Sequence, residues 1–348
     1  MNDEAEAPEV ATDDQGQLAP TTVSGLNVSV KGFDNEDAAR QLGQFVGEIV
    51  IELGRSLDLT TLDGVTIGVD YDAALASVDR GMSGLRPLSR SDTTEMQGVA
   101  MSPAVMRDGV VKTHLVFSAE RLVPLIWQGP EVTDDDRAVS VGIIAHECAH
   151  VQVTAEKERA IPACRFGTPI EGYEHAVMFQ IAEVCWDEYA VCRLSAPFAS
   201  MQNDTHAATV IACAEVAGDQ TDAAIRSYRL HGDLDRLLGE AGPPLCSPLK
   251  AVAYLLGGLD GDGADWSSQA AARTAIDDAG YGDIVDELHA ELRRLWDTRG
   301  SWTPTLDTFA LLEAIAKSTF DANGIFFHTN ADGDCRIDVP FTPGTMPI

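Results

Sequence analysis

Positive charge is scarce in this sequence. It has 24 Lys and Arg residues against 55 Asp and Glu residues, which gives a formal net charge of −31. The field of such a chain repels the phosphates of DNA and RNA and the surfaces of anionic lipids. We therefore expect no nucleic acid and no membrane among its partners.

Long hydrophobic runs and the features of a secretory signal are also missing. No segment is long and apolar enough to be expected to span a bilayer. The first 20 residues contain six acidic side chains, and no basic residue precedes Lys31. Because a secretory signal needs a basic start followed by an apolar stretch, the sequence predicts a cytoplasmic protein.

Closely spaced cysteine pairs are absent as well. The seven cysteines form no CxxC pattern, and none of them precedes Cys148. An odd number of cysteines without the spacing of a small disulfide-rich scaffold indicates reduced thiols.

What the sequence does contain is the pattern of an α+β protein. Its 348 residues, 45% of them hydrophobic, are enough for one large domain or two ordinary ones. Asp34 is expected to cap the first helix. The expected strands are 26–33, 64–71, 97–104 and 110–117, and the expected helices are 35–57, 133–157, 173–195, 206–218, 220–239, 247–258, 268–278, 283–297 and 305–319.

Four regions follow from this order of elements. We expect a disordered acidic tail over 1–24 and a domain with a small mixed sheet and an active-site helix over 25–200. A mostly helical C-terminal region is expected over 201–328, and an irregular tail over 329–348.

One pentapeptide, HECAH, carries the strongest chemical signal. His146 and His150 are four residues apart on an expected helix, so both imidazoles lie on one face and can bind one metal ion. Glu147 adjoins the first histidine, where it can take a proton from a water molecule that the metal activates. The apolar residues before the motif indicate a buried helix that presents its polar face to a cleft.

This pattern resembles the zincin metallopeptidases, and the resemblance extends over residues 35–197. Metzincins have a glycine and a third histidine where this chain has Val153 and Glu156. Peptide deformylases take a cysteine ligand from upstream of the motif, where this chain has no cysteine. The segment GTPIEGYEH partly resembles the aspzincin motif, but Glu171 stands in place of its aspartate and Tyr173 is out of register.

The gluzincin branch takes its third ligand from a glutamate on a later helix, and EVCWDEYAVCRLSAP (183–197) fits that role. Glu188 opens a stretch similar to the ligand helix of compact bacterial zincins. Glu183 is the competitor, because with Asp187 it forms an E-x-x-x-D pattern similar to that of thermolysin-like enzymes. Neighbouring helical residues are about 100° apart, so these three acids cannot all point at one ion. We favour Glu188.

A gluzincin-like site also implies a donor that stabilises the oxyanion formed during hydrolysis. We prefer His231 and Tyr228, because a helical C-terminal region would close one side of the cleft. The full set of candidates is Tyr173, His175, Tyr189, His206, Tyr228 and His231.

The resemblance implies a zinc metallopeptidase of gluzincin-like type. His146, His150 and Glu188 would bind Zn²⁺, and Glu147 would be the general base in the hydrolysis of a peptide or protein substrate. The alternative is a regulatory or binding protein that keeps the zincin fold without useful turnover. A cleft plugged by the C-terminal helices or by the loop 78–95 would favour that alternative.

Overall fold

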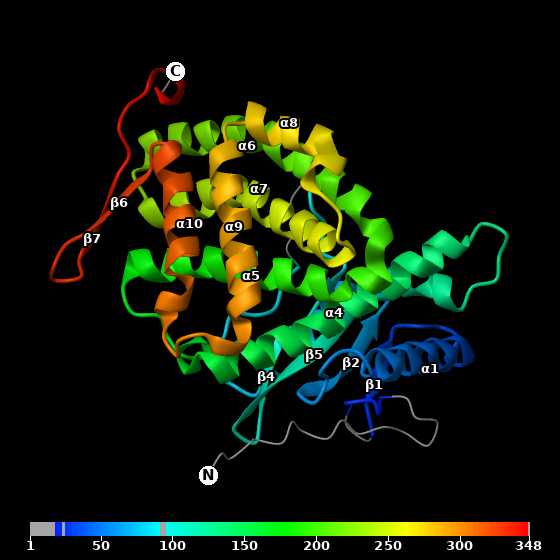
Figure 1. Cartoon of the computed structure of the whole chain (residues 1–348). Coiled ribbons are helices and arrows are strands. Elements are labelled where there is room, and N and C mark those ends of the chain that lie inside the picture. The colour runs from blue at the N-terminus through cyan, green and yellow to red at the C-terminus, as the bar shows by residue number, and fades with distance from the viewer. Residues whose placement is uncertain (1–17, 23–24, 91–94, 347–348) are drawn as a thin grey trace, which may run out of the picture. The chain divides into compact units, whose positions relative to one another are not determined.

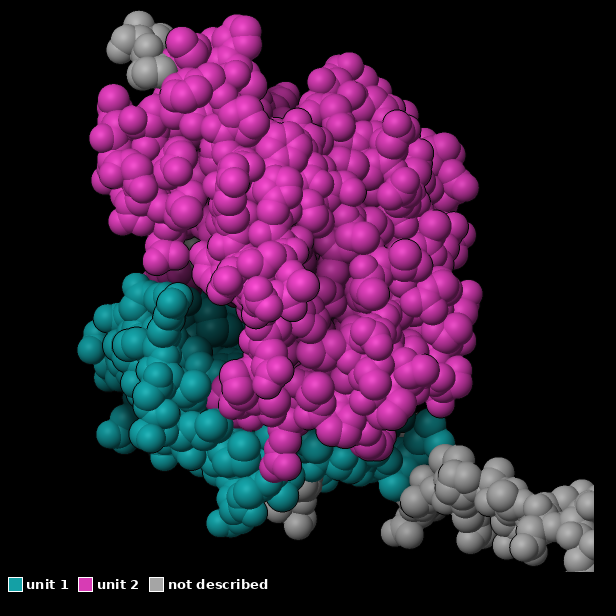
Figure 2. Space-filling view, turned by 90° about the vertical axis from the view of Figure 1, so that its left-hand side faces the viewer, with its two compact units in different colours: residues 1–89, 99–152 teal, residues 90–98, 153–348 magenta. Residues whose placement is uncertain are grey.

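The computed structural model describes residues 18–22, 25–90 and 95–346 (Figure 1). Its internal contacts divide the chain into two units, which Figure 2 shows in different colours. The first unit comprises residues 1–89 and 99–152, and the second comprises 90–98 and 153–348. The boundary at Gln152 falls within one continuous helix, α4 (Asp134–Ala160).

A mixed five-stranded sheet is the centre of the first unit (Figure 1). The strands follow the order β1-β2-β5-β3, and β4 also pairs with β5. The pairs β1–β2 and β2–β5 are parallel, whereas β3 and β4 run antiparallel to β5. The strands are β1 (Val28–Lys31), β2 (Leu62–Gly68), β3 (Ala100–Met101), β4 (Ala104–Arg107) and β5 (Val110–Ser118).

Helix α1 (Glu36–Leu53) connects β1 to β2 and buries Leu42, Val46 and Val50. Their spacing is that of one helical face, which is why the sequence pattern predicts this helix correctly. The expected cap is wrong by one residue. Asn35, not Asp34, has the extended backbone of an N-cap, and its side chain accepts hydrogen bonds from the N–H groups of Asp37 and Ala38.

Two short helices of the first unit have no counterpart in the sequence prediction. They are α2 (Tyr71–Ala76) and α3 (Ala119–Leu122). Segments of this length are too short to develop a 3.6-residue hydrophobic period.

The second unit is built mainly from helices (Figure 1). The sequence predicts a break between helices 206–218 and 220–239, and this is wrong. The observed break lies at Gly232, whose positive φ of 68° ends one helix, and at Asp233, whose side chain caps the next. The helices are α5 (Tyr173–Ala199), α6 (Asn203–His231), α7 (Leu234–Asp262), α8 (Ala270–Asp278), α9 (Gly282–Thr298) and α10 (Ala310–Ala322).

The expectation of an irregular segment after residue 328 is also wrong in part. Strands β6 (Phe326–Thr329) and β7 (Cys335–Asp338) form an antiparallel hairpin. The turn between them is held by Asn330, whose side chain accepts from the N–H groups of Asp332 and Asp334. The sequence pattern does not predict these strands, because four residues give no clear alternation of polar and apolar side chains.

The architecture is therefore α+β, with a mixed sheet and a mostly helical C-terminal region, as predicted. Among the residues that the structure describes, no helix has the length and hydropathy needed to cross a membrane. The expected acidic tail falls largely on residues 1–17 and 23–24, which lie outside the described residues.

Candidate metal centre

The helix that carries HECAH begins with a well-formed N-terminus. The hydroxyl of Thr133 accepts from the N–H of Asp136, whose carboxylate in turn accepts from the N–H of Thr133 (3.1 and 2.8 Å). Three aspartates occupy the first turn, where the helix dipole favours negative charge. From there α4 enters the core, and Ala145, Cys148 and Ala149 around the motif are fully buried.

The structure brings His146, His150 and Glu188 together. Each side chain offers one ligand atom, and these atoms all lie within 4.8 Å of one another. The two imidazole rings are 5.0 Å apart between centroids and nearly perpendicular, at 81°. His146 and Glu188 are buried, and His150 is partly exposed. This group could hold a metal ion.

The donor set fits zinc. Zinc binds imidazole nitrogen and carboxylate oxygen at about 2.0–2.2 Å, and its tetrahedral ligands then lie about 3.4 Å apart. Small side-chain rotations would bring donor atoms that are within 4.8 Å of one another to that spacing. Three protein ligands leave the fourth position open, which is the arrangement of catalytic zinc sites.

Glu147, the expected general base, is buried and has a hydrogen-bond partner in the short link between β3 and β4. The hydroxyl of Ser102 donates to Glu147 Oε2 over 2.6 Å, and it lies 3.1 Å from the carbonyl oxygen of the same residue. Ser102 follows β3 directly and precedes β4. A donor on one carboxylate oxygen fixes the orientation of the carboxylate.

Glu183, the competing ligand, is engaged elsewhere. Lys157 Nζ lies 2.7 Å from Glu183 Oε1 and 2.7 Å from Asp187 Oδ2. The lysine is buried. Burial alone would lower the pKa of Lys157, but the two carboxylates outweigh it and raise that pKa above its usual range. Both acids of the E-x-x-x-D pattern thus serve as counter-ions of one buried ammonium group.

A second lysine lies beside the favoured ligand. Lys250 Nζ, from α7, is 3.4 Å from Glu188 Oε1. It also lies 5.6 Å from the centre of the Tyr254 ring, one helical turn further along α7. Glu188 therefore has a cationic neighbour in addition to the two histidines.

Tyr189, a candidate oxyanion donor, is hydrogen-bonded within the second unit. Its hydroxyl donates to Asp260 over 2.5 Å, and His289 and Arg293 contact the same carboxylate. Burial raises the pKa of Asp260, but the hydrogen bonds from His289, Arg293 and Tyr189 outweigh it and hold this pKa below its usual range. Tyr189 thus anchors α5 to α7.

The two preferred oxyanion donors lie together near the end of α6. The ring centroids of Tyr228 and His231 are 5.8 Å apart. His231 Nδ1 accepts from the N–H of Asp233, and its Nε2 lies 4.0 Å from Glu240. These contacts belong to the turn between α6 and α7, so they give His231 a local structural role.

The other candidates have partners of their own. The Tyr173 hydroxyl donates to Asp235 over 3.2 Å, and His175 Nε2 lies 3.4 Å from Glu313. The His206 ring faces Tyr254 at 5.3 Å between centroids. Of these, His206 shares its aromatic neighbour with Lys250, the lysine beside Glu188.

The cysteine within the motif belongs to the core. Cys148 is completely buried, and burial raises the pKa of its thiol well above the usual range. A thiol that resists ionisation is a poor metal ligand. Cys185 and Cys192 are likewise buried in α5, and all seven cysteines are free.

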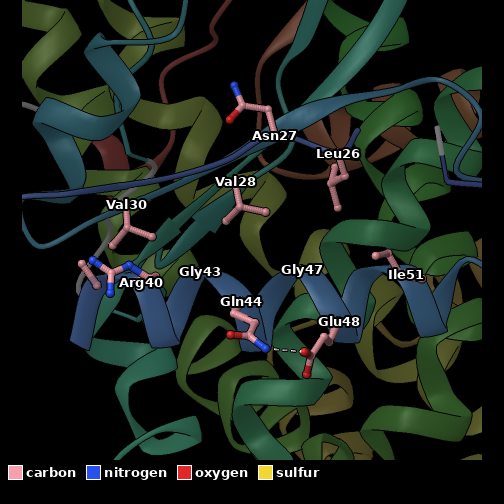
Figure 3. A pocket seen from close by; sticks show the side chains of 11 residues that line it. Leu26, Asn27, Val28, Val30, Arg40, Gly43, Gln44, Gly47, Glu48 and Ile51 are labelled. Atoms are coloured by element: carbon pink, nitrogen blue, oxygen red, sulfur yellow. Dashed lines mark hydrogen bonds between the residues drawn. The ribbon is translucent and has the colours of Figure 1, made fainter. Parts of the chain in front are cut away.

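A separate groove of about 700 Å³ lies between β1 and α1 in the first unit (Figure 3). Val28 and Val30 line it from the strand, and Gly43 and Gly47 open it on the helix side. The only charged residues in its lining are Arg40 and Glu48, and Glu48 accepts a hydrogen bond from Gln44. Its lining holds one carboxylate and neither histidine nor cysteine, so these residues do not form a three-ligand metal group.

Comparison of the chain with protein-family models, with curated proteins and with solved structures gives no match.

Three residues around the site are absent from the sequence prediction: Ser102, Lys157 and Lys250. Only Lys157 leaves a signal in the sequence, because it follows His146 by eleven residues and so returns to the same helical face. Ser102 and Lys250 reach Glu147 and Glu188 from other elements, and local patterning carries no information about such contacts.

Proposed function

We propose that this protein is a zinc-dependent metallopeptidase. The observation that carries the proposal is the approach of His146, His150 and Glu188, with their ligand atoms within 4.8 Å, on the helix that also presents Glu147. Zinc bound there would supply Lewis acidity toward a water molecule and toward the scissile carbonyl.

The residues of the chain would divide the remaining work. The histidines bind through neutral imidazole nitrogens and Glu188 through its carboxylate. Glu147 accepts a proton from the attacking water and passes it to the nitrogen of the departing amine. Ser102 holds Oε2 of Glu147 by its 2.6 Å hydrogen bond, which leaves Oε1 to carry the proton.

The test has two parts, and the first is the metal content of the purified protein. About one zinc per chain is expected, and it should be lost in the His146→Ala variant. A chain that contains no zinc and takes none up on titration would refute the metal site.

The second part separates binding from catalysis. Glu147→Gln keeps the shape of the side chain and its acceptor oxygen but removes the base. We expect unchanged zinc content and at least about a 100-fold loss of hydrolysis, measured on a fluorescently labelled unfolded protein such as casein. Full activity in this variant would rule out Glu147 as the general base.

A further inference from the structure

Lys157, Glu183 and Asp187 form a cluster of buried and partly buried charges on the two helices that carry the proposed metal ligands. Lys157 Nζ contacts both Asp187 carboxylate oxygens, at 2.9 and 2.7 Å, and Glu183 Oε1 at 2.7 Å. Its side chain is 5% exposed, against 31% for Glu183 and 20% for Asp187. The proposed hydrolysis uses none of these three residues.

The cluster joins the two helices that supply the proposed ligands. Lys157 is on α4, seven residues after His150, which corresponds to about 10 Å along the helix axis. Eleven residues after His146, it also lies within about 20° of that histidine around the axis. Glu183 and Asp187 are one turn apart on α5, and Glu188 follows Asp187 directly.

We propose that Lys157 is a positioning residue for the metal site, one that fixes α5 against α4 so that Glu188 reaches His146 and His150. This inference rests on the proposed zinc site and extends it to a residue that touches neither the metal nor the substrate. The ammonium group forms three short contacts with two side chains, so α5 can neither slide nor rotate without breaking at least one of them.

Electrostatic attraction to Lys157 also holds the Glu183 and Asp187 carboxylates close together. Without the ammonium group, two carboxylates one turn apart would face each other in a partly desolvated environment, and like charges at that spacing repel. The relief of that repulsion is a rotation or shift of α5. Because Glu188 is the next residue after Asp187, the same movement would displace the proposed ligand.

The measurement is the affinity of the full-length, metal-stripped chain for Zn²⁺, determined by competition with a chromophoric chelator. Lys157→Met should weaken zinc binding by about 10- to 100-fold, the range for residues that orient metal ligands from outside the coordination sphere. Lys157→Arg, which keeps a cation able to meet both acids, should recover most of the affinity.

Two controls separate positioning from general loss of stability. Lys317→Met removes a lysine that pairs with Asp321 within α10, and it should leave zinc affinity unchanged. Ile276→Ala opens a cavity in α8, which packs mainly against α6 and α9. It should lower the melting temperature without weakening zinc binding. All affinities are compared at a temperature where each variant is folded.

If Lys157→Met does not fold, Asp187→Asn takes its place in the affinity measurement. This variant keeps the pair between Lys157 and Glu183 and should still weaken zinc binding. Wild-type zinc affinity in Lys157→Met or in Asp187→Asn would overturn this inference alone. So would an equal loss of affinity in Ile276→Ala. Absence of zinc binding in the unaltered chain would instead overturn the metal site, and this inference with it.

Discussion

Glu183 and Glu188 lie five residues apart on one helix, yet their side chains have different neighbours. Glu188 lies with His146 and His150, whereas Glu183 is paired with Lys157. Glu188→Ala should therefore weaken zinc binding by at least about 100-fold, because it removes one of three proposed ligands. Glu183→Ala should weaken it by about tenfold or less, because it removes only part of an outer cluster.

Chelator competition on both variants measures this difference, with circular dichroism to confirm that each is folded. A larger loss of affinity in Glu183→Ala than in Glu188→Ala would transfer the ligand role to Glu183. Equal and small losses in both would mean that neither carboxylate binds the metal.

The part of the site that could be predicted is the part that a single helix determines. The approach of His146 and His150 follows from a spacing of four residues, and the rotation of about 100° between Asp187 and Glu188 already separates the competing acids. The partners of these acids could not be predicted, since Ser102 and Lys250 come from other elements. Which tyrosine or histidine faces the site depends on tertiary packing in the same way.

At the scale of elements, the crossing of α5 and α7 depends on small residues. A Cβ atom at Gly257 would overlap the carbonyl of Tyr189, and one at Gly261 would overlap Ala196. Gly257→Ala should therefore lower the free energy of unfolding by about 1–3 kcal/mol or more, as overpacking does in a close-packed core. Urea denaturation followed by circular dichroism measures the change.

Gly239 provides a matched control on the same helix. A Cβ atom there meets nothing within 4 Å. Gly239→Ala should raise the free energy of unfolding by about 0.5–1 kcal/mol, because alanine has the better helix propensity. Destabilisation of the same size in both variants would mean that the close approach of α5 and α7 does not require glycine at position 257.

The elements that sequence patterning places correctly are those with a sustained hydrophobic period, such as α1 and α9. Helix α7 shows where such reasoning fails. Pro243 and Pro244 suggest an end, because proline has no N–H to donate, but the helix continues through both. Burial of Leu245 and Leu249 holds the segment in place, and the Ser247 hydroxyl donates to the carbonyl of Pro243.

For the whole molecule, the dominant property is its net charge of −31. Acidic residues outnumber basic ones by more than two to one, so the chain has too few cations to give each carboxylate one of its own. Exposed ion pairs such as that between Arg336 and Asp338 contribute at most about 1 kcal/mol each. Repulsion among the excess carboxylates opposes the compact state, and we expect it to outweigh these attractions.

Salt should therefore stabilise this protein, although it weakens individual ion pairs. The Debye length falls from about 30 Å at 0.01 M to about 10 Å at 0.1 M ionic strength, which screens repulsion between distant carboxylates. We expect the melting temperature of the metal-stripped chain to rise by several degrees between 0.01 and 0.3 M salt. Each kcal/mol added to the free energy of unfolding raises the melting temperature by about 2–4 °C. Differential scanning calorimetry in NaCl and in NaBr measures it, and screening predicts the same rise with both anions. A fall in melting temperature would show that attractive pairs dominate, whereas a rise that differs between the two anions would indicate a specific ion effect in place of screening.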